Sequence, residues 1–194
     1  MCYLMRSELG LSYKHVRVLD ARTNKLRSLV LRQHYAIKML ELHAHGYRVL
    51  NVDESWLSET NYSRMTWSKR GRPNARSTKG LPQRIALVAA MDTSGAAYVA
   101  LSTGKTDSDV IITFLSYLCD LLDLEDLGWR NKTVILLDNA AYHHSRETMR
   151  AMKKFGLRVI YSGPYSFTAA PVETFFAHLK TGDLNPLKLQ LGKR

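Results

Sequence analysis

The chain has 194 residues, 45% of them hydrophobic, and a formal net charge of +11. This length and composition predict one ordinary globular domain plus an appendage, with enough apolar residues to bury a sizeable core. No apolar stretch approaches the roughly 20 residues that span a bilayer, and no charged leader precedes a short apolar run, so we expect neither a membrane-spanning nor a secreted protein. Cys2 and Cys119 stand alone without metal-ligand spacing, which indicates reduced thiols and an intracellular location.

The excess of positive charge is confined to the N-terminal part of the chain. Residues 1–52 carry nine Lys and Arg against three Asp and Glu, residues 53–84 carry seven against three, and residues 85–194 carry twelve against eleven. This asymmetry favours a polyanionic partner that approaches from one side over an evenly solvated basic surface. Nucleic acid fits better than a membrane, because a membrane-binding basic helix also needs a strong exposed apolar face.

The first elements in chain order are helical. Residues 9–16 read as a turn that enters a short basic helix, and residues 24–45 read as an amphipathic helix. The apolar residues available to pack this second helix on the core are Leu26, Leu29, Val30, Ile37, Leu40 and Leu42. A predicted strand then covers residues 47–53 and stops at the acidic pair Asp53-Glu54. Adjacent strand residues face opposite sides, so only one of these two acids can face a given site.

The segment from about residue 56 to residue 84 is unusually basic and rich in turn formers, so we predict a long loop with at most a short hairpin at residues 62–68. Loops of this length in a compact domain are usually functional or disordered. Its basic groups are suited to nucleic-acid phosphates and its aromatic rings are available to stack or pack; a solvated loop is the alternative. The candidate DNA-binding residues are Arg64, Lys69, Arg70, Arg72, Arg76, Lys79 and Arg84.

The second half of the chain alternates strands and helices. Residues 84–91 and 97–101 predict two strands joined by a turn at 92–95, which with the preceding strand make a three-stranded antiparallel meander. Either Thr106 or Ser108 is expected to cap the helix whose apolar stripe runs from Ile111 to Leu122.

Three further elements follow. Residues 133–137 are continuously apolar, as in a strand buried on both faces, and end at Asp138. A helix from about Ser145 and a strand at 157–161 come next. Pro171 suits the first position of a last helix, in which Glu173 lies beside the apolar stripe and is free to point away from the core.

Three acidic residues, Asp53, Asp138 and Glu173, thus sit at two predicted strand ends and one helix start. Carboxylates gathered at one point repel unless a cation shares them, and hard oxygen ligands select Mg²⁺ or Mn²⁺. Two such ions roughly 3.5–4 Å apart can activate an attacking oxygen and stabilise a leaving one at phosphorus. Any single Asp of this kind is more often a turn or cap residue, but the combination favours a metal site.

The motifs resemble those of the mariner-like DDE transposases and their bacterial insertion-sequence relatives, which have an RNase H-like catalytic core. The resemblance spans about residues 47–181, and 34 residues separate Asp138 from Glu173. It departs where the family usually has Pro, an acidic residue and Asn, and this chain has Phe167, Thr168 and Ala170. The matching stretches are Val52-Asp53-Glu54-Ser55, Leu137-Asp138-Asn139-Ala140-Ala141-Tyr142-His143, Pro164-Tyr165-Ser166 and Pro171-Val172-Glu173.

This resemblance implies an α/β fold with an RNase H-like mixed sheet, in which three antiparallel strands precede strand–helix alternation. Residues 1–46 would be a remnant of a helix-turn-helix DNA-binding region plus a linker helix, and residues 47–194 the DDE catalytic domain. The insertion at about 56–84 would be a clamp that reaches DNA and a partner subunit. Two Mg²⁺ or Mn²⁺ ions would be held by Asp53 (rather than Glu54), Asp138 and Glu173.

The activity implied is DNA transposition and integration: cleavage at the element's end, then attack of the freed 3′ hydroxyl on target DNA. The partners would be double-stranded DNA (transposon ends and target) and a second copy of the chain, and the location the nucleus in a eukaryote and otherwise the cytoplasm or nucleoid. Asn139 would orient a ligand carboxylate, and His143 would contact phosphate or steady the metal-bearing loop, unless its role is structural. Alternatives are a catalytically inactive, transposase-derived DNA-binding protein and a nuclease for RNA–DNA hybrids.

Overall fold

The computed structural model describes residues 7–8, 23–57, 70–71, 85–166 and 170–181. The predicted helical fragment at 9–16 and the loop residues Phe167 and Thr168 lie outside this range. Of the candidate DNA-binding residues only Arg70 is described, in an exposed turn with Gly71. The others lie outside the described residues: Arg64, Lys69, Arg72, Arg76, Lys79 and Arg84.

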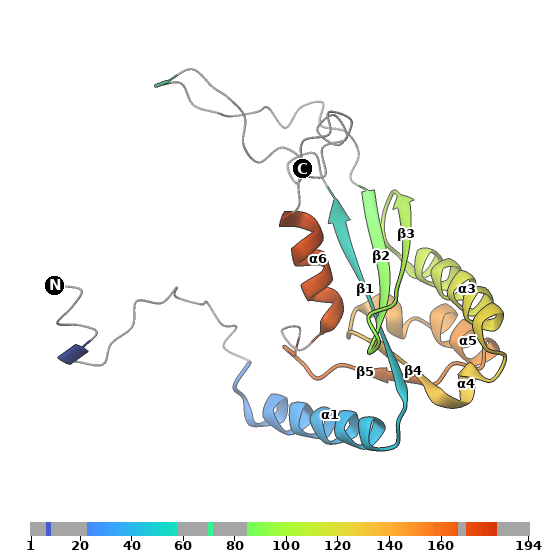
Figure 1. The fold of residues 1–194 in the computed structure, drawn as a ribbon. Coiled ribbons are helices and arrows are strands. Elements are labelled where there is room, and N and C mark those ends of the chain that lie inside the picture. Colours follow the sequence, from blue (N-terminus) through green and yellow to red (C-terminus); the bar gives the residue numbers. More distant parts are fainter. Residues whose placement is uncertain (1–6, 9–22, 58–69, 72–84, 167–169, 182–194) are drawn as a thin grey trace.

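A five-stranded mixed sheet organises the domain (Figure 1). Its strand order is β3-β2-β1-β4-β5, with β1, β2 and β3 antiparallel and β4 and β5 parallel to β1. Three antiparallel strands therefore precede the strand–helix alternation, which confirms the sheet predicted from the sequence. The strands are β1 (Arg48–Leu57), β2 (Ile85–Asp92), β3 (Ala97–Thr103), β4 (Thr133–Leu137) and β5 (Val159–Tyr161).

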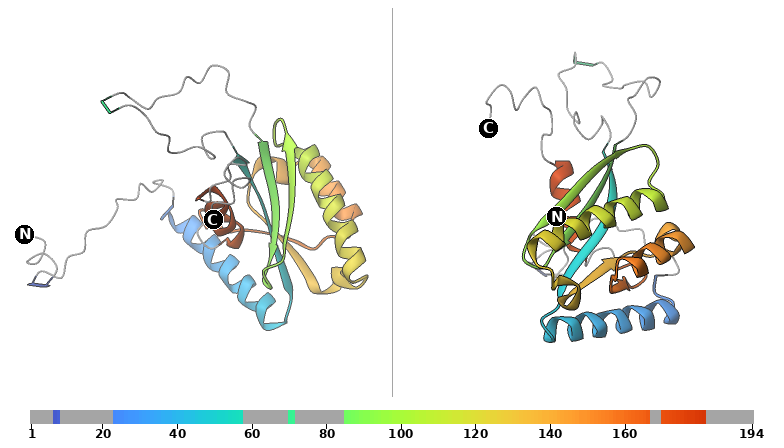
Figure 2. Two further views of the ribbon diagram at one scale, coloured as in Figure 1. Left: turned by 45° about the horizontal axis from the view of Figure 1, so that its top comes forward. Right: turned by 90° about the vertical axis from the view of Figure 1, so that its right-hand side faces the viewer.

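Helices cover both faces of this sheet, as Figure 2 shows with α3 and α6 on opposite sides of the strands. The main core lies beneath α3 (Ser108–Glu125) and α5 (Arg146–Lys154), and a smaller core beneath α6 (Pro171–Thr181). Even-numbered β1 residues such as Leu50 and Val52 belong to the main core, while Leu57 belongs to the smaller one. The remaining described elements are α1 (Leu26–Ala44), α4 (Trp129–Lys132) and the 3₁₀ helix η2 (Ala141–His144).

The helix starts are set by local capping. Asp107, not Thr106 or Ser108 as predicted, caps α3, because its carboxylate accepts the backbone N–H groups of residues 109 and 110. Helix α5 begins beside Ser145, as predicted, and the Ser145 hydroxyl caps it by accepting the backbone N–H of Thr148. Pro171 opens α6 at the position where a missing N–H costs nothing, also as predicted. None of the described helices is long and apolar enough to cross a membrane.

Strand β1 does not stop at Asp53, so the predicted strand end was wrong. The strand runs on to Leu57 because β2 pairs with it throughout, from Leu50 opposite Asp92 to Leu57 opposite Ile85. The parallel pairing with β4 ends earlier, at Asn51 opposite Leu136. Asp53 therefore lies two residues beyond the last β1 residue that pairs with β4, which leaves it open on that side.

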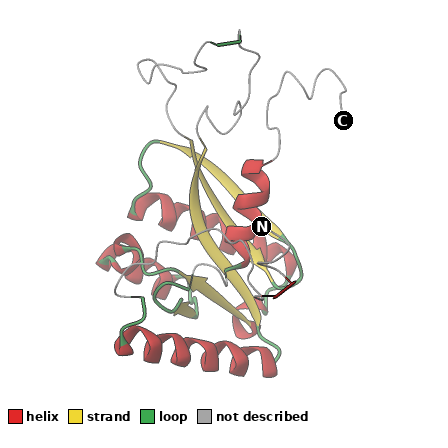
Figure 3. Cartoon of the chain, turned by 90° about the vertical axis from the view of Figure 1, so that its left-hand side faces the viewer, coloured by secondary structure: helices red, strands yellow, loops and turns green. Residues whose placement is uncertain are grey.

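The expectation that the apolar stripe of α1 packs on the core was also wrong. Among its described residues only Leu42 is buried, whereas Leu26 is 78% and Leu40 is 69% exposed. Figure 3 shows α1 along one end of the domain, apart from the helices that flank the sheet. Periodicity identifies an apolar face, but it does not establish that another element covers that face.

One buried amide joins three of these elements. Asn51 in β1 is 5% exposed; its Oδ1 accepts the backbone N–H of Val172 in α6 at 3.2 Å, and its Nδ2 donates to the carbonyl of Leu136 in β4 at 3.4 Å. A small polar residue at this position thus ties the start of α6 to both central strands.

We expect Asn51→Ala to lower the free energy of unfolding by about 2 kcal/mol, because it leaves a buried N–H and a buried carbonyl without their partner. Urea denaturation monitored by circular dichroism measures the change. The matched control is Asn131→Ala, which removes an exposed amide from α4. Equal losses in the two variants would contradict the assignment.

Candidate active site

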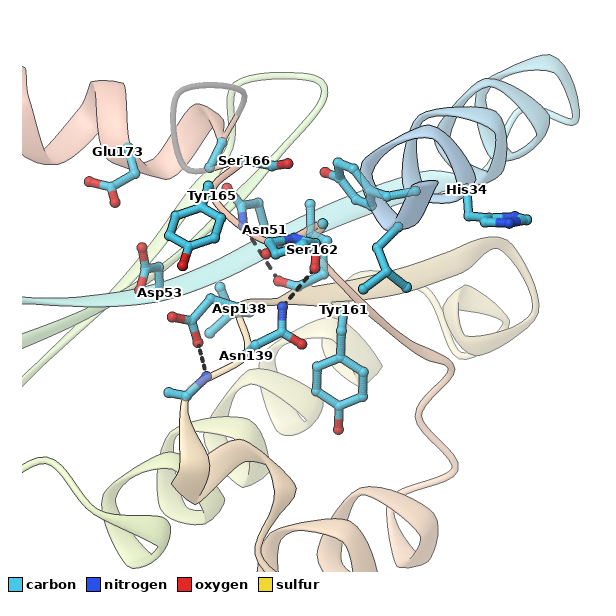
Figure 4. A pocket seen from close by; sticks show the side chains of 18 residues that line it. His34, Asn51, Asp53, Asp138, Asn139, Tyr161, Ser162, Tyr165, Ser166 and Glu173 are labelled. Atoms are coloured by element: carbon cyan, nitrogen blue, oxygen red, sulfur yellow. Dashed lines mark hydrogen bonds between the residues drawn. The ribbon is translucent and has the colours of Figure 1, made fainter. Parts of the chain in front are cut away.

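A cavity of about 720 Å³ opens where β4 ends beside β1. Its lining includes all three predicted carboxylates, Asp53, Asp138 and Glu173, together with Asn139. Figure 4 shows these side chains converging from two strands and α6, with Asp53 drawn between Asp138 and Glu173. The structure therefore brings the three acids, which are far apart in the sequence, to one cavity.

The sheet explains how Asp53 and Asp138 meet. Asn51 pairs with Leu136, and Asp53 and Asp138 each follow two residues later along parallel strands. Because strand side chains alternate, Asp53 faces the same side as Asn51, which is the side of α6. Glu173 lies in the exposed first turn of α6, close to the backbone that Asn51 holds.

The two aspartates have opposite electrostatic settings. Burial raises the pKa of Asp53 to about 7; the backbone N–H of Glu54 opposes the shift, and the negative charges of Glu54, Asp138 and Glu173 add to it. A hydrogen bond from His143 lowers the pKa of Asp138, against the effect of burial and with help from the Ala140 N–H. Asp138 is therefore held ionised, while Asp53 resists ionisation.

Glu54 faces away from the cavity, on the other face of β1. Its side chain is 6% exposed and accepts hydrogen bonds from the Tyr142 hydroxyl at 2.9 Å and from Nε2 of His143 at 3.1 Å. Strand alternation predicted that one of the two acids faces away from the site, but the local sequence indicated no role for Glu54. Strand alternation places Glu54 on the buried face, and burying an unpaired acid is costly. Together these two facts could have predicted that Glu54 has a buried hydrogen-bond partner.

His143 lies beneath Asp138 and is fully buried. Its Nδ1 is 2.8 Å from Oδ1 of Asp138, and its Nε2 contacts Glu54. Burial alone would lower the pKa of His143, but the hydrogen bonds to Asp138 and Glu54 outweigh it and raise the pKa to about 9. His144, in contrast, stacks on Tyr161 with ring centroids 4.1 Å apart.

Asn139 braces the loop that follows β5. Its Nδ2 donates to the carbonyl of Ser162 at 2.7 Å, as Figure 4 shows. The hydrogen bond that the structure gives this amide thus goes to the cavity wall and not to a carboxylate.

The cavity wall contains residues that sequence reasoning missed. Tyr165 has a φ of 59°, a left-handed conformation that costs a non-glycine residue roughly 1–2 kcal/mol, and its ring projects toward the carboxylates in Figure 4. A Cβ on Gly163 would lie 3.1 Å from Cα of Arg32 in α1, closer than ordinary van der Waals contact, so glycine lets the turn and α1 approach closely without displacing either. Through it, α1 contributes Leu31, His34 and Tyr35 to the cavity.

The three acids suit a hard divalent cation in the type of ligand atom that they offer. Their oxygens line one cavity from three elements, and their mutual repulsion contributes to the raised pKa of Asp53, which a cation would relieve. Within the described residues no group of three or more His, Cys, Asp or Glu side chains lies close enough together to hold a metal ion. The donor set thus fits a divalent ion in ligand type, with the three carboxylates ranged around the cavity.

The raised pKa of Asp53 predicts a pH-dependent stability of the metal-free protein. Between about pH 4 and pH 7 the folded chain keeps a proton on Asp53 that the unfolded chain has lost, so the free energy of unfolding falls as the pH rises through this window. Asp53→Asn removes this fall. Its stability relative to the parent should grow to roughly 2–4 kcal/mol by pH 8 and vanish near pH 4.

Urea denaturation in EDTA at a series of pH values measures this difference. Asp120→Asn, which neutralises an exposed acid on α3, serves as the control for loss of one negative charge. A difference between Asp53→Asn and the parent that does not depend on pH would refute the raised pKa.

Comparison with known families gives one match over most of the chain. The model of the family described as DDE superfamily endonuclease matches residues 48–188. No curated protein sequence matches the chain significantly.

Solved structures of the Mos1 mariner transposase share the fold. The Mos1 mariner paired end complex with Mn matches with a TM-score of 0.68 and 22% sequence identity, over 89% of this chain and 53% of that one. The catalytic domain of Mos1 mariner transposase matches with a TM-score of 0.58 and 18% identity, over 87% and 74% of the two chains. The chain thus has the RNase H-like fold of that catalytic domain and spans about half the length of the Mos1 chain in the complex.

Proposed function

Because the chain belongs to the DDE superfamily endonucleases, we propose that it is a transposase catalytic domain that cleaves and joins DNA strands. The observation that carries the proposal is the convergence of Asp53, Asp138 and Glu173 on one cavity. The likeness of the fold to the Mos1 mariner transposase supports it.

We propose further that the three carboxylates hold two divalent ions, Mg²⁺ or Mn²⁺. Structures of Mos1 have been solved with Mn and with Mg. Such ions supply Lewis-acid stabilisation of the charge that builds up on phosphate oxygens during transfer. The choice of oxygen ligands and the repulsion that raises the pKa of Asp53 support this part of the proposal.

The chain's own residues prepare the site for phosphoryl transfer. Oδ1 of Asp138 is held by the Ala140 N–H at 2.9 Å and by His143 at 2.8 Å, so Asp138 is both ionised and oriented. We assign His143 to this positioning role and not to direct contact with phosphate, because it is fully buried. Asn139 shapes the wall through Ser162.

Double-stranded DNA, as transposon ends and as target, is the proposed substrate, and a dimer of this chain the proposed active form. Paired-end and strand-transfer complexes are known for Mos1. The basic segment at about 56–84 leaves the sheet from the pair Leu57 and Ile85, at the end of β1 beyond Asp53. A segment anchored there is suited to contact the phosphate backbone of a bound duplex.

The decisive test of activity is nicking and strand transfer by the purified protein on labelled duplex DNA. We expect cutting with Mg²⁺ or Mn²⁺ and none with EDTA. Asp53→Asn, Asp138→Asn and Glu173→Gln should each reduce the rate at least about 100-fold, since each removes a charged ligand of the ions that would stabilise charge on the reacting phosphate. Asp120→Asn should leave the rate unchanged.

Metal-dependent cutting that survives in all three variants would contradict the assignment of these residues as catalytic. Salt-sensitive DNA binding without cutting, in the parent and the variants alike, would favour the catalytically inactive DNA-binding protein instead.

The role of the basic segment has its own test. We expect replacement of Lys69, Arg70, Arg72 and Arg76 by Ala to weaken binding to duplex DNA of any sequence. The slope of log affinity against log salt should fall by up to about 3–4, because each lost phosphate contact removes about 0.9. Fluorescence anisotropy at several salt concentrations measures both quantities.

The matched control removes the same charge from another face. Four exposed basic residues on α5 are replaced by Ala: Arg146, Arg150, Lys153 and Lys154. An equal loss of affinity in both sets would show that net charge, not the segment, determines binding.

A further inference from the structure

Glu54 is a buried acid that the proposed chemistry does not use. Its side chain is 6% exposed and points to the face of β1 opposite Asp53 and the cavity. A carboxylate in such a place is costly unless hydrogen-bond donors meet it. Two donors do: the Tyr142 hydroxyl lies 2.9 Å from Oε2, and Nε2 of His143 lies 3.1 Å from Oε1.

His143 carries this contact onward to Asp138. The ring is fully buried, and its second nitrogen, Nδ1, lies 2.8 Å from Oδ1 of Asp138. Nδ1 also lies 3.3 Å from the backbone carbonyl oxygen of Asp138. Nε2 therefore faces the carboxylate of Glu54, and Nδ1 faces both the carboxylate and the carbonyl of Asp138. A flip or rotation of the ring would break at least one of these bonds, so the two acids together fix the ring.

Asp138 is held at one oxygen only. Its Oδ1 accepts from His143 and from the Ala140 N–H, the latter drawn in Figure 4. Within the described part of the chain, no hydrogen bond reaches Oδ2. The side chain is 51% exposed and lines the cavity, so without these two bonds it would turn freely. A carboxylate with one oxygen fixed and the other available is prepared to bind a metal ion.

We infer that Glu54 is a positioning residue that acts through His143, from the far face of β1, to hold Asp138 in its ligand orientation. The inference rests on the proposed function, because it takes Asp138 to be a metal ligand. Two adjacent residues of β1 then serve one site: Asp53 directly, and Glu54 by supporting the acid contributed by β4.

The test measures Mn²⁺ binding to the full chain without DNA, by electron paramagnetic resonance of free Mn²⁺. Loss of an outer partner of a metal ligand typically weakens metal affinity about 10–100-fold. We expect about tenfold weaker binding for Glu54→Gln, which keeps the shape but loses the charge, and up to about 100-fold for Glu54→Ala. Tyr142→Phe is the matched control: it removes a hydrogen bond to the same carboxylate but leaves the contact with His143, so Mn²⁺ affinity should not change.

A second readout needs no metal. In ¹⁵N-histidine-labelled protein, both ring N–H protons of His143 should be visible by NMR, because both are hydrogen-bonded and buried. Glu54→Ala should lose the Nε2–H signal, and both Glu54 variants should shift the Nδ1–H signal that reports the contact with Asp138. Tyr142→Phe should leave the Nδ1–H signal in place. Where Glu54→Ala does not fold, Glu54→Gln decides.

Mn²⁺ affinity equal to that of the parent in a folded Glu54 variant would overturn the inference, and Glu54 would then only stabilise η2. The failure of the proposed function looks different. In that case Asp138→Asn binds Mn²⁺ as well as the parent does, so that neither the metal site nor its support by Glu54 stands.

Discussion

The amide of Asn51, in β1, hydrogen-bonds to both other elements that position the acidic residues, α6 and β4. It sits in β1, accepts an N–H from α6 and donates to a carbonyl of β4. Asp53 follows two residues later in β1, Asp138 two residues after Leu136, and Glu173 one residue after Val172. One buried side chain thus holds together the three backbone segments next to the carboxylates. Because its partners are buried backbone groups, loss of the amide would leave them without these hydrogen bonds.

The site combines acids in unequal settings. His143 lowers the pKa of Asp138, whereas burial and the negative charges of neighbouring carboxylates raise the pKa of Asp53. Gathering these charges costs stability in the absence of a counter-charge, which is common where function and not folding selects the residues. On the other face of β1, Glu54 is compensated by its own partners. One strand therefore carries an uncompensated acid next to a compensated one.

Periodicity and turn chemistry in the sequence predicted most of the sheet and the helix starts. The apolar run before Asp138 predicted β4, and Pro171 predicted the start of α6. The true end of β1 was missed because Glu54, Ser55 and Trp56 do not look like a half-buried strand; pairing with β2 decides it. The link between Glu54 and His143 joins residues 89 positions apart, so local pattern carries no trace of it.

The part of the cavity wall that α1 forms could not be predicted from local sequence patterns either. Its apolar stripe predicted core packing, yet α1 touches the site through the Gly163 turn, a contact set by the absence of a Cβ. Family resemblance named the three acids together, but burial, face and hydrogen bonding follow only from the tertiary arrangement.

The pairing of Leu57 with Ile85 has an evolutionary consequence. Residues 58–84 leave and re-enter the sheet at neighbouring strand positions. The pairing of β1 with β2 therefore offsets the entropic cost of bringing the ends of this segment together. Doubling the length of such a loop costs only about 0.6 kcal/mol more. The insertion can therefore be lengthened, shortened or exchanged between relatives while the strands that carry the acids keep their alignment. Changes in the insertion are in this way separated from the arrangement of the three acids.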